Sequence, residues 1–310
     1  MITRRFLLGT ALLASPAIAR ARTEINLIVP SSPGGSADTT ARLLGQQLDI
    51  VGVRNKVINR SAGAGVEGAL YVLRSSADSG NVLIGGPRNL MFIPARERLS
   101  YDINNFEPLC MFSRAAFALV VRSDKYVSVN ELLDEGRRRP VSIGSGAEEN
   151  EFLLNNLFRL GQSNMTYIPY RGGGDVARDI LSGVLDAGHV SIATVAGAVA
   201  SGLMKLMAHT LDNVSENITS YPELNHLSKV TGIYHESLSS YHWHGLYTPR
   251  GVLMPELVEA VRKICDDTKF INDHLSRGMV VNFMVNEEFR QYHEMVDSVL
   301  IRPALTQIRR

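Results

Sequence analysis

The stretch Ser32-Pro33-Gly34-Gly35-Ser36-Ala37-Asp38-Thr39-Thr40 follows the apolar run Ile25–Pro30 and opens a segment with helical spacing. A strand that turns through a glycine pair directly into a helix leaves backbone N–H groups free at the helix N-terminus. The positive end of the helix dipole lies behind these groups, which suits the turn to a small anion. Similar turns at Gly144-Ser145-Gly146 and Arg171-Gly172-Gly173-Gly174 predict a cleft that holds a carboxylate or a similar group.

The length of the chain predicts two lobes. Its 310 residues are about twice a typical domain. Short apolar runs alternate with helical patterns, which predicts parallel sheets with helices on both faces. Two longer extended runs, 106–121 and 241–247, interrupt the alternation and are predicted to cross between the lobes. We therefore expect an α/β protein with residues 23–115 and 240–310 in the first lobe and residues 116–239 in the second.

The individual elements follow from the same periodicity. The predicted strands are Ile25–Pro30, Lys56–Asn59, Val82–Gly86, Val141–Gly144, Met165–Pro169 and Ala187–Ser191. The predicted helices are Ala37–Gln47, Gly65–Arg74, Glu149–Leu160 and Asp175–Ser182. Two more helices, near Pro255–Thr268 and Glu287–Gln307, are expected to pack back on the first lobe.

The N-terminus has the layout of an export signal. Arg4 and Arg5 precede the apolar stretch Phe6–Ile18, which is too short to span a bilayer comfortably. Ala17-Ile18-Ala19 offers small residues to a signal peptidase, so residues 1–19 are predicted to be the signal peptide, with residue 21 as the alternative end. The arginine pair resembles a twin-arginine signal with imperfect spacing, which leaves the Sec and Tat routes open. The mature protein is predicted to be soluble and periplasmic.

Charge and cysteine usage restrict the function classes. A formal net charge of +1 without a basic stripe argues against a nucleic-acid surface. Cys110 and Cys265 lie far apart in the sequence and are predicted to be buried and unpaired. His242-Trp243-His244 puts two imidazoles on one side of a predicted strand, but no third ligand lies nearby in the sequence. Packing beside Trp243 is therefore favoured over a metal site.

One glycine pattern imitates a cofactor site. Gly63-Ala64-Gly65-Val66-Glu67-Gly68 spells a dinucleotide-binding motif after a predicted strand. The next strand ends in Gly85-Gly86-Pro87, which supplies no acidic residue for a ribose hydroxyl. The sequence also contains no Walker loop, nucleophile elbow or His-Glu-x-x-His motif. It therefore predicts binding without a cofactor, a metal or catalysis.

Four stretches together resemble the Bug receptors, the extracytoplasmic solute-binding proteins of tripartite tricarboxylate transporters. These stretches are Pro33–Arg42, Asn59–Gly65, Pro169–Gly183 and Trp243–Gly251. The resemblance implies a type II periplasmic binding fold, with two doubly wound lobes joined by two crossover strands. It also implies a monomer that closes over a carboxylate and delivers it to the permease subunits of such a transporter. A subunit that reports ligand to a two-component sensor kinase is the alternative, and a periplasmic enzyme is a less favoured one.

The resemblance also implies where the ligand lies. In the family, the first loop and an opposing Tyr-Lys/Arg-Gly loop hold one ligand carboxylate, partly through ordered water. These loops correspond to Ser32–Asp38 and Tyr170–Gly173, with Arg171 where lysine is usual. Ser36 is also a plausible N-cap, and Asp38 either opposes the helix dipole or contacts the ligand.

Two stretches depart from the family pattern. Ala147-Glu148-Glu149-Asn150 stands where serines or threonines and a histidine are common. Its carboxylates either suit the helix dipole or, if they face the cleft, repel the distal carboxylate of a diacid. In Gly86-Pro87-Arg88-Asn89, Arg88 either binds a distal acid or faces solvent. The ligand could therefore be a diacid or a monocarboxylate with an amine, amide or aromatic group.

The candidate ligand-binding residues are Ser32, Pro33, Gly34, Gly35, Ser36, Asp38, Gly86, Arg88, Ser145, Gly146, Glu148, Tyr170, Arg171, Gly172 and Gly173.

Overall fold

The first half of the fold is a six-stranded sheet with strand order β11-β4-β10-β3-β1-β2. The computed structural model describes residues 24–170, 172–212, 218 and 220–308, so the predicted signal peptide and Arg171 lie outside it. β1 pairs in parallel with β2 and β3, whereas β10 runs antiparallel to β3 and β4. The strands are β1 (Ile25–Val29), β2 (Asn55–Asn59), β3 (Asn81–Gly85), β4 (Phe106–Ala115), β10 (Trp243–Pro249) and β11 (Met279–Met284).

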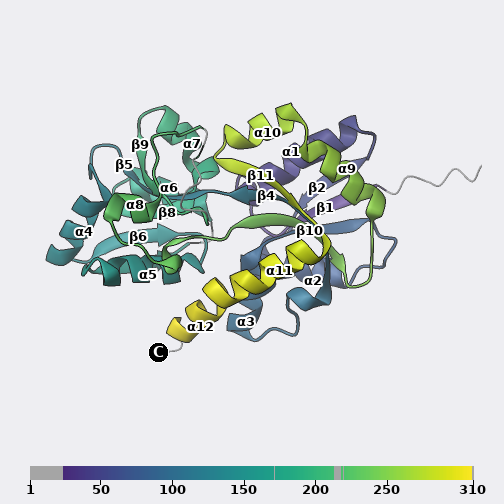
Figure 1. The fold of residues 1–310 in the computed structure, drawn as a ribbon, viewed down its shortest axis with the longest axis horizontal. Helices are drawn as coiled ribbons and strands as arrows, with labels where there is room; N and C mark the ends of the chain where they lie inside the picture. Colours follow the sequence, from purple (N-terminus) through teal and green to yellow (C-terminus); the bar gives the residue numbers. More distant parts are fainter. Residues whose placement is uncertain (1–23, 171, 213–217, 219, 309–310) are drawn as a thin grey trace, which may run out of the picture.

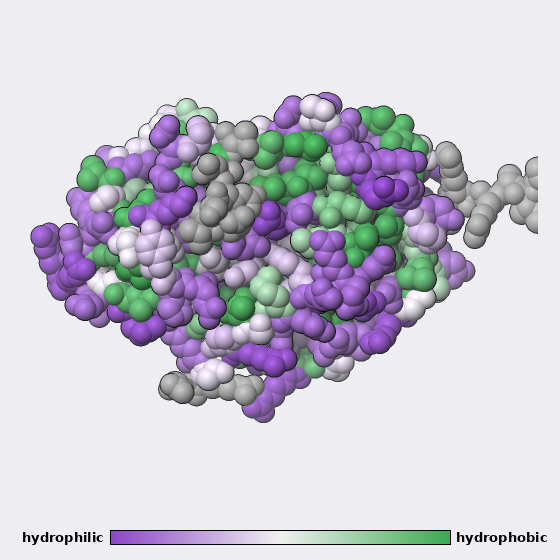
Figure 2. All heavy atoms as spheres, viewed as in Figure 1, coloured by the Kyte–Doolittle hydropathy of each residue, from purple (hydrophilic) through white to green (hydrophobic). Residues whose placement is uncertain are grey.

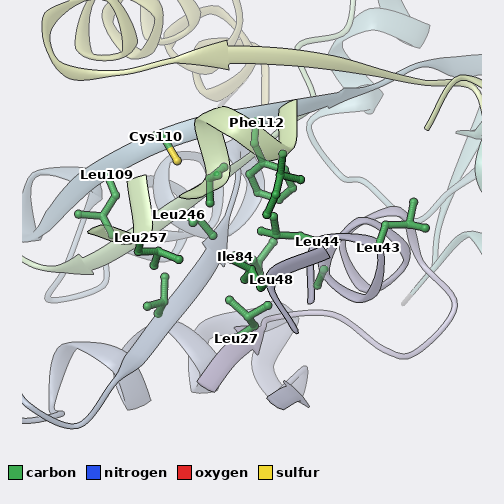
Figure 3. Close-up of a cluster of buried hydrophobic side chains, with 14 of the residues drawn as sticks. Leu27, Leu43, Leu44, Leu48, Ile84, Leu109, Cys110, Phe112, Leu246 and Leu257 are labelled. Atoms are coloured by element: carbon green, nitrogen blue, oxygen red, sulfur yellow. The ribbon is translucent and has the colours of Figure 1, made fainter. Parts of the chain in front are cut away.

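Helices cover both faces of this sheet, as the sequence predicts for an α/β fold. One face packs on α1 (Ser36–Ile50), α9 (Pro255–Cys265) and α10 (Thr268–Leu275). Figure 3 shows this cluster, in which leucines from α1, α9 and β10 meet above β1. The other face packs on α2 (Val66–Leu73), α3 (Ile93–Glu97) and α11 (Asn286–Val296). Cys110 and Cys265 are free thiols buried in the first cluster, and burial raises the pKa of Cys265 to about 12.

The second half is a five-stranded sheet with strand order β7-β6-β8-β5-β9. Its strands are β5 (Phe117–Arg122), β6 (Val141–Ser145), β7 (Met165–Pro169), β8 (Ala187–Ser191) and β9 (Met204–His209). α4 (Val129–Arg138), α5 (Asn150–Leu160) and α8 (Leu227–Thr231) cover one face. α6 (Gly173–Leu181) and α7 (Ile192–Ala200) cover the other. We call each sheet with its helices a lobe.

The chain passes between the lobes on neighbouring segments. The extended run predicted at 106–121 is two strands, since β4 ends at Ala115 and β5 begins in the other sheet at Phe117. The Ala115 N–H donates to the His242 carbonyl at 2.8 Å, which joins the outgoing and returning segments. Figure 1 shows the middle of the chain, in teal and green, forming one lobe while both ends of the chain form the other.

The C-terminal helices differ in one respect from the expectation. α12 (Arg302–Ile308) contributes Ala304 to a core cluster of the first lobe, but it also contacts α5 of the second lobe. This contact is possible because α11 continues through a wider helical turn at 297–301 directly into α12 (Figure 1).

The visible face is largely hydrophilic, with separate hydrophobic patches (Figure 2). Within the described residues, no helix combines the length and hydropathy needed to cross a membrane.

A buried carboxylate joins three segments of the second lobe. Asp186 accepts hydrogen bonds from two nitrogens of Arg139, both at 2.8 Å. It also accepts one from the Tyr126 hydroxyl at 3.0 Å and one from the Ser142 N–H at 2.9 Å. The bonds from Arg139 and Ser142 outweigh the effect of burial and hold the pKa of Asp186 far below its usual range.

Asp186→Asn is expected to lower the free energy of unfolding by about 2 to 3 kcal/mol near neutral pH, because charge-assisted bonds are lost. Because the folded-state pKa is depressed, the stabilisation is present above the unfolded pKa of about 3.9 and is lost as pH falls below it. Urea unfolding measured from neutral to acid pH should show the two proteins converging below about pH 4. Asp134→Asn, which removes an exposed partner of Arg137 on α4, is the control and should change little.

Candidate functional site

A cavity of about 490 Å³ lies between the two lobes. The first lobe contributes the loops that follow β1 and β3, together with the start of β10. The second contributes the loops that follow β6, β7 and β8. The parallel strands of both sheets thus bring their carboxyl ends to the cavity, where open α/β sheets bind their ligands.

A buried aspartate fixes the loop between β1 and α1. Gly34 has a φ of +85°, which favours glycine, and its N–H donates to Asp38 Oδ2 at 3.0 Å. Arg42 and Asn59 donate to the same carboxylate at 2.9 Å each. Burial opposes ionisation, but these bonds outweigh it and lower the pKa of Asp38. Asp38 is buried and is not among the residues that line the cavity, and its part in ligand binding stays a prediction.

The start of α1 offers free donors to the cavity. The first N–H groups of a helix, here those of Ser36 and Ala37, have no carbonyl partner within it. Gly35 is the N-cap, which corrects the prediction that Ser36 caps the helix. The Ser36 hydroxyl instead lies 3.3 Å from His244 Nε2. Gly35, Ser36 and Ala37 all line the cavity.

Closely packed glycines form the opposing wall. A Cβ on Gly146 would lie 2.7 Å from the Gly172 Cα, so only glycine lets these two loops touch. Gly173 begins α6 and lines the cavity. Ser145 lies behind the wall, because its hydroxyl donates to the His189 carbonyl at 2.9 Å. Ser145 is not among the residues that line the cavity, and its part in ligand binding stays a prediction.

The remaining predicted residues divide between two neighbouring hollows. Glu148 and Tyr170 line a second cavity of about 560 Å³, which shares Ser32 and Arg88 with the first. Arg171 lies outside the described residues. The first cavity, of about 490 Å³, is called the main cavity below. The predicted residues that line it are Ser32, Pro33, Gly34, Gly35, Ser36, Gly86, Arg88, Gly146, Gly172 and Gly173.

Several cavity residues are absent from the sequence-based set. Phe117 stacks on His242 with ring centroids 3.8 Å apart, and both line the cavity with His244. Burial lowers the pKa of His244 to about 3, so this imidazole is neutral. The alternation in His242-Trp243-His244 is the available signal, although by itself it favours packing beside Trp243. Among the described residues, no group of three or more histidine, cysteine or acidic side chains is placed to hold a metal ion.

The two adjacent glutamates have different surroundings. Glu148 forms ion pairs with Arg96 and, at 3.4 Å, with Arg88. Glu149 is 1% exposed and lines the main cavity. The sequence left open whether either carboxylate faces the cleft, and Glu149 does.

Solved structures of other proteins have the same fold. The solved structure of a periplasmic transporter has a TM-score of 0.79 with 23% identity, covering 94% of this chain and 98% of that one. The structure of R. palustris Rpa4515 with adipate has a TM-score of 0.76 with 21% identity, covering 90% of this chain and 94% of that one. These similarities establish the fold, which is the predicted two-lobed binding fold.

Sequence comparison establishes the family. Protein BugT of Bordetella pertussis is 27% identical over 239 residues, which cover 73% of this chain and 71% of that protein. The model of the tripartite tricarboxylate transporter family receptor matches residues 37–300. Because this match extends over most of the chain, from the first turn of α1 to the helical segment before α12, the chain belongs to the tripartite tricarboxylate transporter family of solute-binding receptors.

Proposed function

We propose that the protein captures a small organic carboxylate between its lobes in the periplasm and delivers it to the permease of a tripartite tricarboxylate-type transporter. One observation carries this proposal: the cavity between the lobes is lined by the helix N-termini of α1 and α6. Helix N-termini favour anions through free N–H groups and the helix dipole. The adipate bound by Rpa4515 and the export signal predicted for residues 1–19 support the same function.

The first lobe binds the carboxylate in this proposal. The N–H groups of Ser36 and Ala37 donate to its oxygens, while Asp38 keeps the preceding loop in place. Closure about the crossover segments then buries the ligand against Gly173. A micromolar dissociation constant requires about −8 kcal/mol, which a few charge-assisted hydrogen bonds and desolvation can supply.

A thermal-shift screen of small carboxylates tests this function. A ligand at about 100 times its dissociation constant should stabilise the folded state by roughly 2.7 kcal/mol, which raises the melting temperature measurably. Trp243 is the single tryptophan of the chain and lines the cavity, so its fluorescence should change with the same ligands. If no carboxylate changes either signal, the proposed ligand class is wrong.

A further inference from the structure

Glu149 lines the cavity, and its carboxylate has no hydrogen-bond partner in another described residue. Its side chain is almost fully buried, and both carboxylate oxygens lack such a partner. His242 Nδ1 lies 3.5 Å from Glu149 Oε1. A buried carboxylate without a partner is costly, so its position against an open cavity points to a ligand that supplies the donors.

The neighbouring hydrogen bonds show that His242 Nδ1 is an acceptor. Asn150 Nδ2 donates to the Ser145 hydroxyl at 3.3 Å, which turns Asn150 Oδ1 toward His242. His242 Nε2 therefore donates its proton to Asn150 Oδ1, at 3.0 Å. Burial and nearby charges lower the pKa of His242 well below its usual value, so its ring is neutral and Nδ1 carries a lone pair. Glu149 Oε1 and His242 Nδ1 thus face each other as two acceptors.

Nearby arginines do not supply the missing donor. Arg88 and Arg96 are close enough to oppose the rise in the pKa of Glu149 that burial causes. Both pair with Glu148, which lines the second cavity, and Arg96 also pairs with Glu97 at 2.8 Å. With Glu149 ionised, these two arginines and three glutamates sum to −1, a charge that one ligand ammonium would offset.

We propose that the ligand is an amine-bearing carboxylate whose ammonium group binds between Glu149 and His242. An ammonium has three donors and no acceptor, so it can donate to both of these acceptors. The inference rests on the proposed function, because the ligand carboxylate would lie at the start of α1. The inference also explains why a glutamate lines a cavity that otherwise favours anions. In such a cavity the glutamate would repel the second carboxylate of a diacid.

Calorimetric titration with chain-length series tests this inference. The amino acids glycine, β-alanine, γ-aminobutyrate and δ-aminovalerate are compared with acetate, propionate, butyrate and valerate, and with succinate, glutarate and adipate. We expect an amino acid to bind at least about 10-fold more tightly than its counterpart without the amine. Glu149→Gln should weaken that amino acid by about 10- to 100-fold, since charge-assisted bonds are lost. Glu149→Gln should not weaken the acids that lack an amine.

A matched control removes the same charge two residues along the chain. Glu151 lies in the first turn of α5 and does not line the cavity, so Glu151→Gln should leave binding unchanged. The melting temperature of each variant without ligand checks that it is folded. Unchanged amino-acid affinity in Glu149→Gln would overturn the inference.

Two further outcomes separate this inference from the proposed function. If diacids bind and amino acids do not, the receptor function stands and the inference is wrong. Proton uptake that accompanies diacid binding in the wild type, but not in Glu149→Gln, would show a protonated Glu149 donating to the ligand and would likewise overturn it. If no member of any series binds, the inference and the proposed carboxylate function both fail.

Discussion

Gly35→Leu is expected to abolish carboxylate binding while leaving the protein folded. Gly35 has φ −75° and ψ 170°, an extended conformation that any residue adopts. Its Cβ would meet only the Ser32 carbonyl at 3.6 Å and the Ser31 hydroxyl at 3.9 Å, so the fold accommodates a side chain. That side chain would occupy the space beside the free N–H groups of α1. Losing the bonds from these groups to the ligand should cost at least about 100-fold in affinity, measured by titration calorimetry.

Gly197→Leu is the matched control. Gly197 is exposed on α7, a Cβ there has nothing within 4 Å, and the residue does not line the cavity. It should retain full ligand affinity. Gly34 is a poorer position for this test, because its φ of +85° would strain any other residue. Normal binding by Gly35→Leu would mean that the ligand lies elsewhere.

Trp243→Ala is expected to have the largest effect on stability. Trp243 is 1% exposed, its Nε1–H donates to the Tyr247 hydroxyl at 2.9 Å, and its ring stacks on His293. Truncating a buried tryptophan removes its burial energy and leaves a cavity, at a cost of about 3 to 5 kcal/mol. In this variant the Tyr247 hydroxyl loses its bond from Trp243 but keeps His293 Nε2 as a partner at 2.8 Å. The remaining bond limits the additional loss of stability. Urea unfolding followed by circular dichroism measures the change.

Two comparisons isolate the packing contribution of Trp243. Trp243→Phe keeps an aromatic ring but loses the hydrogen bond to Tyr247, so it should cost clearly less than the alanine variant. Tyr234→Ala removes a ring that is 71% exposed and should stay within about 0.5 kcal/mol of the wild type. If Trp243→Ala loses less than about 1 kcal/mol of stability, the packing of Trp243 with Tyr247 and His293 does not stabilise β10.

Periodicity and turn chemistry predicted much of the fold. The strands expected at 25–30, 141–144 and 165–169 agree with β1, β6 and β7 to within one residue. Their apolar runs are bounded by glycine or proline, which ends each strand sharply. β9 and β11 were not predicted. They lie at sheet edges and are only partly buried, and β9 contains no β-branched residue, so neither has a strong strand pattern.

The glycine loops of the site were also predictable, since their sequence pattern and their position after a strand coincide. Asp38 and Ser145, which are predicted to bind ligand, lie within those same loops but do not line the cavity. Both stabilise a loop from behind, through bonds to Gly34 and His189. Sequence position alone cannot distinguish a residue whose side chain stabilises a loop from one whose side chain the loop presents to a ligand, because both occur at the same spacing.

By itself, the sequence determined a two-lobed α/β fold with glycine-rich turns between strands and helices, because strand-turn-helix patterns and the glycine requirement are local. Only the tertiary structure decided which charge enters the cleft. Glu148 and Glu149 are adjacent, and successive residues where α5 begins point in directions about 100° apart. Which of them faces the cavity depends on how α5 packs on its sheet. Glu149 lies next to His242, whose side chain is 10% exposed, because a crossover segment returns to the cavity from far along the chain.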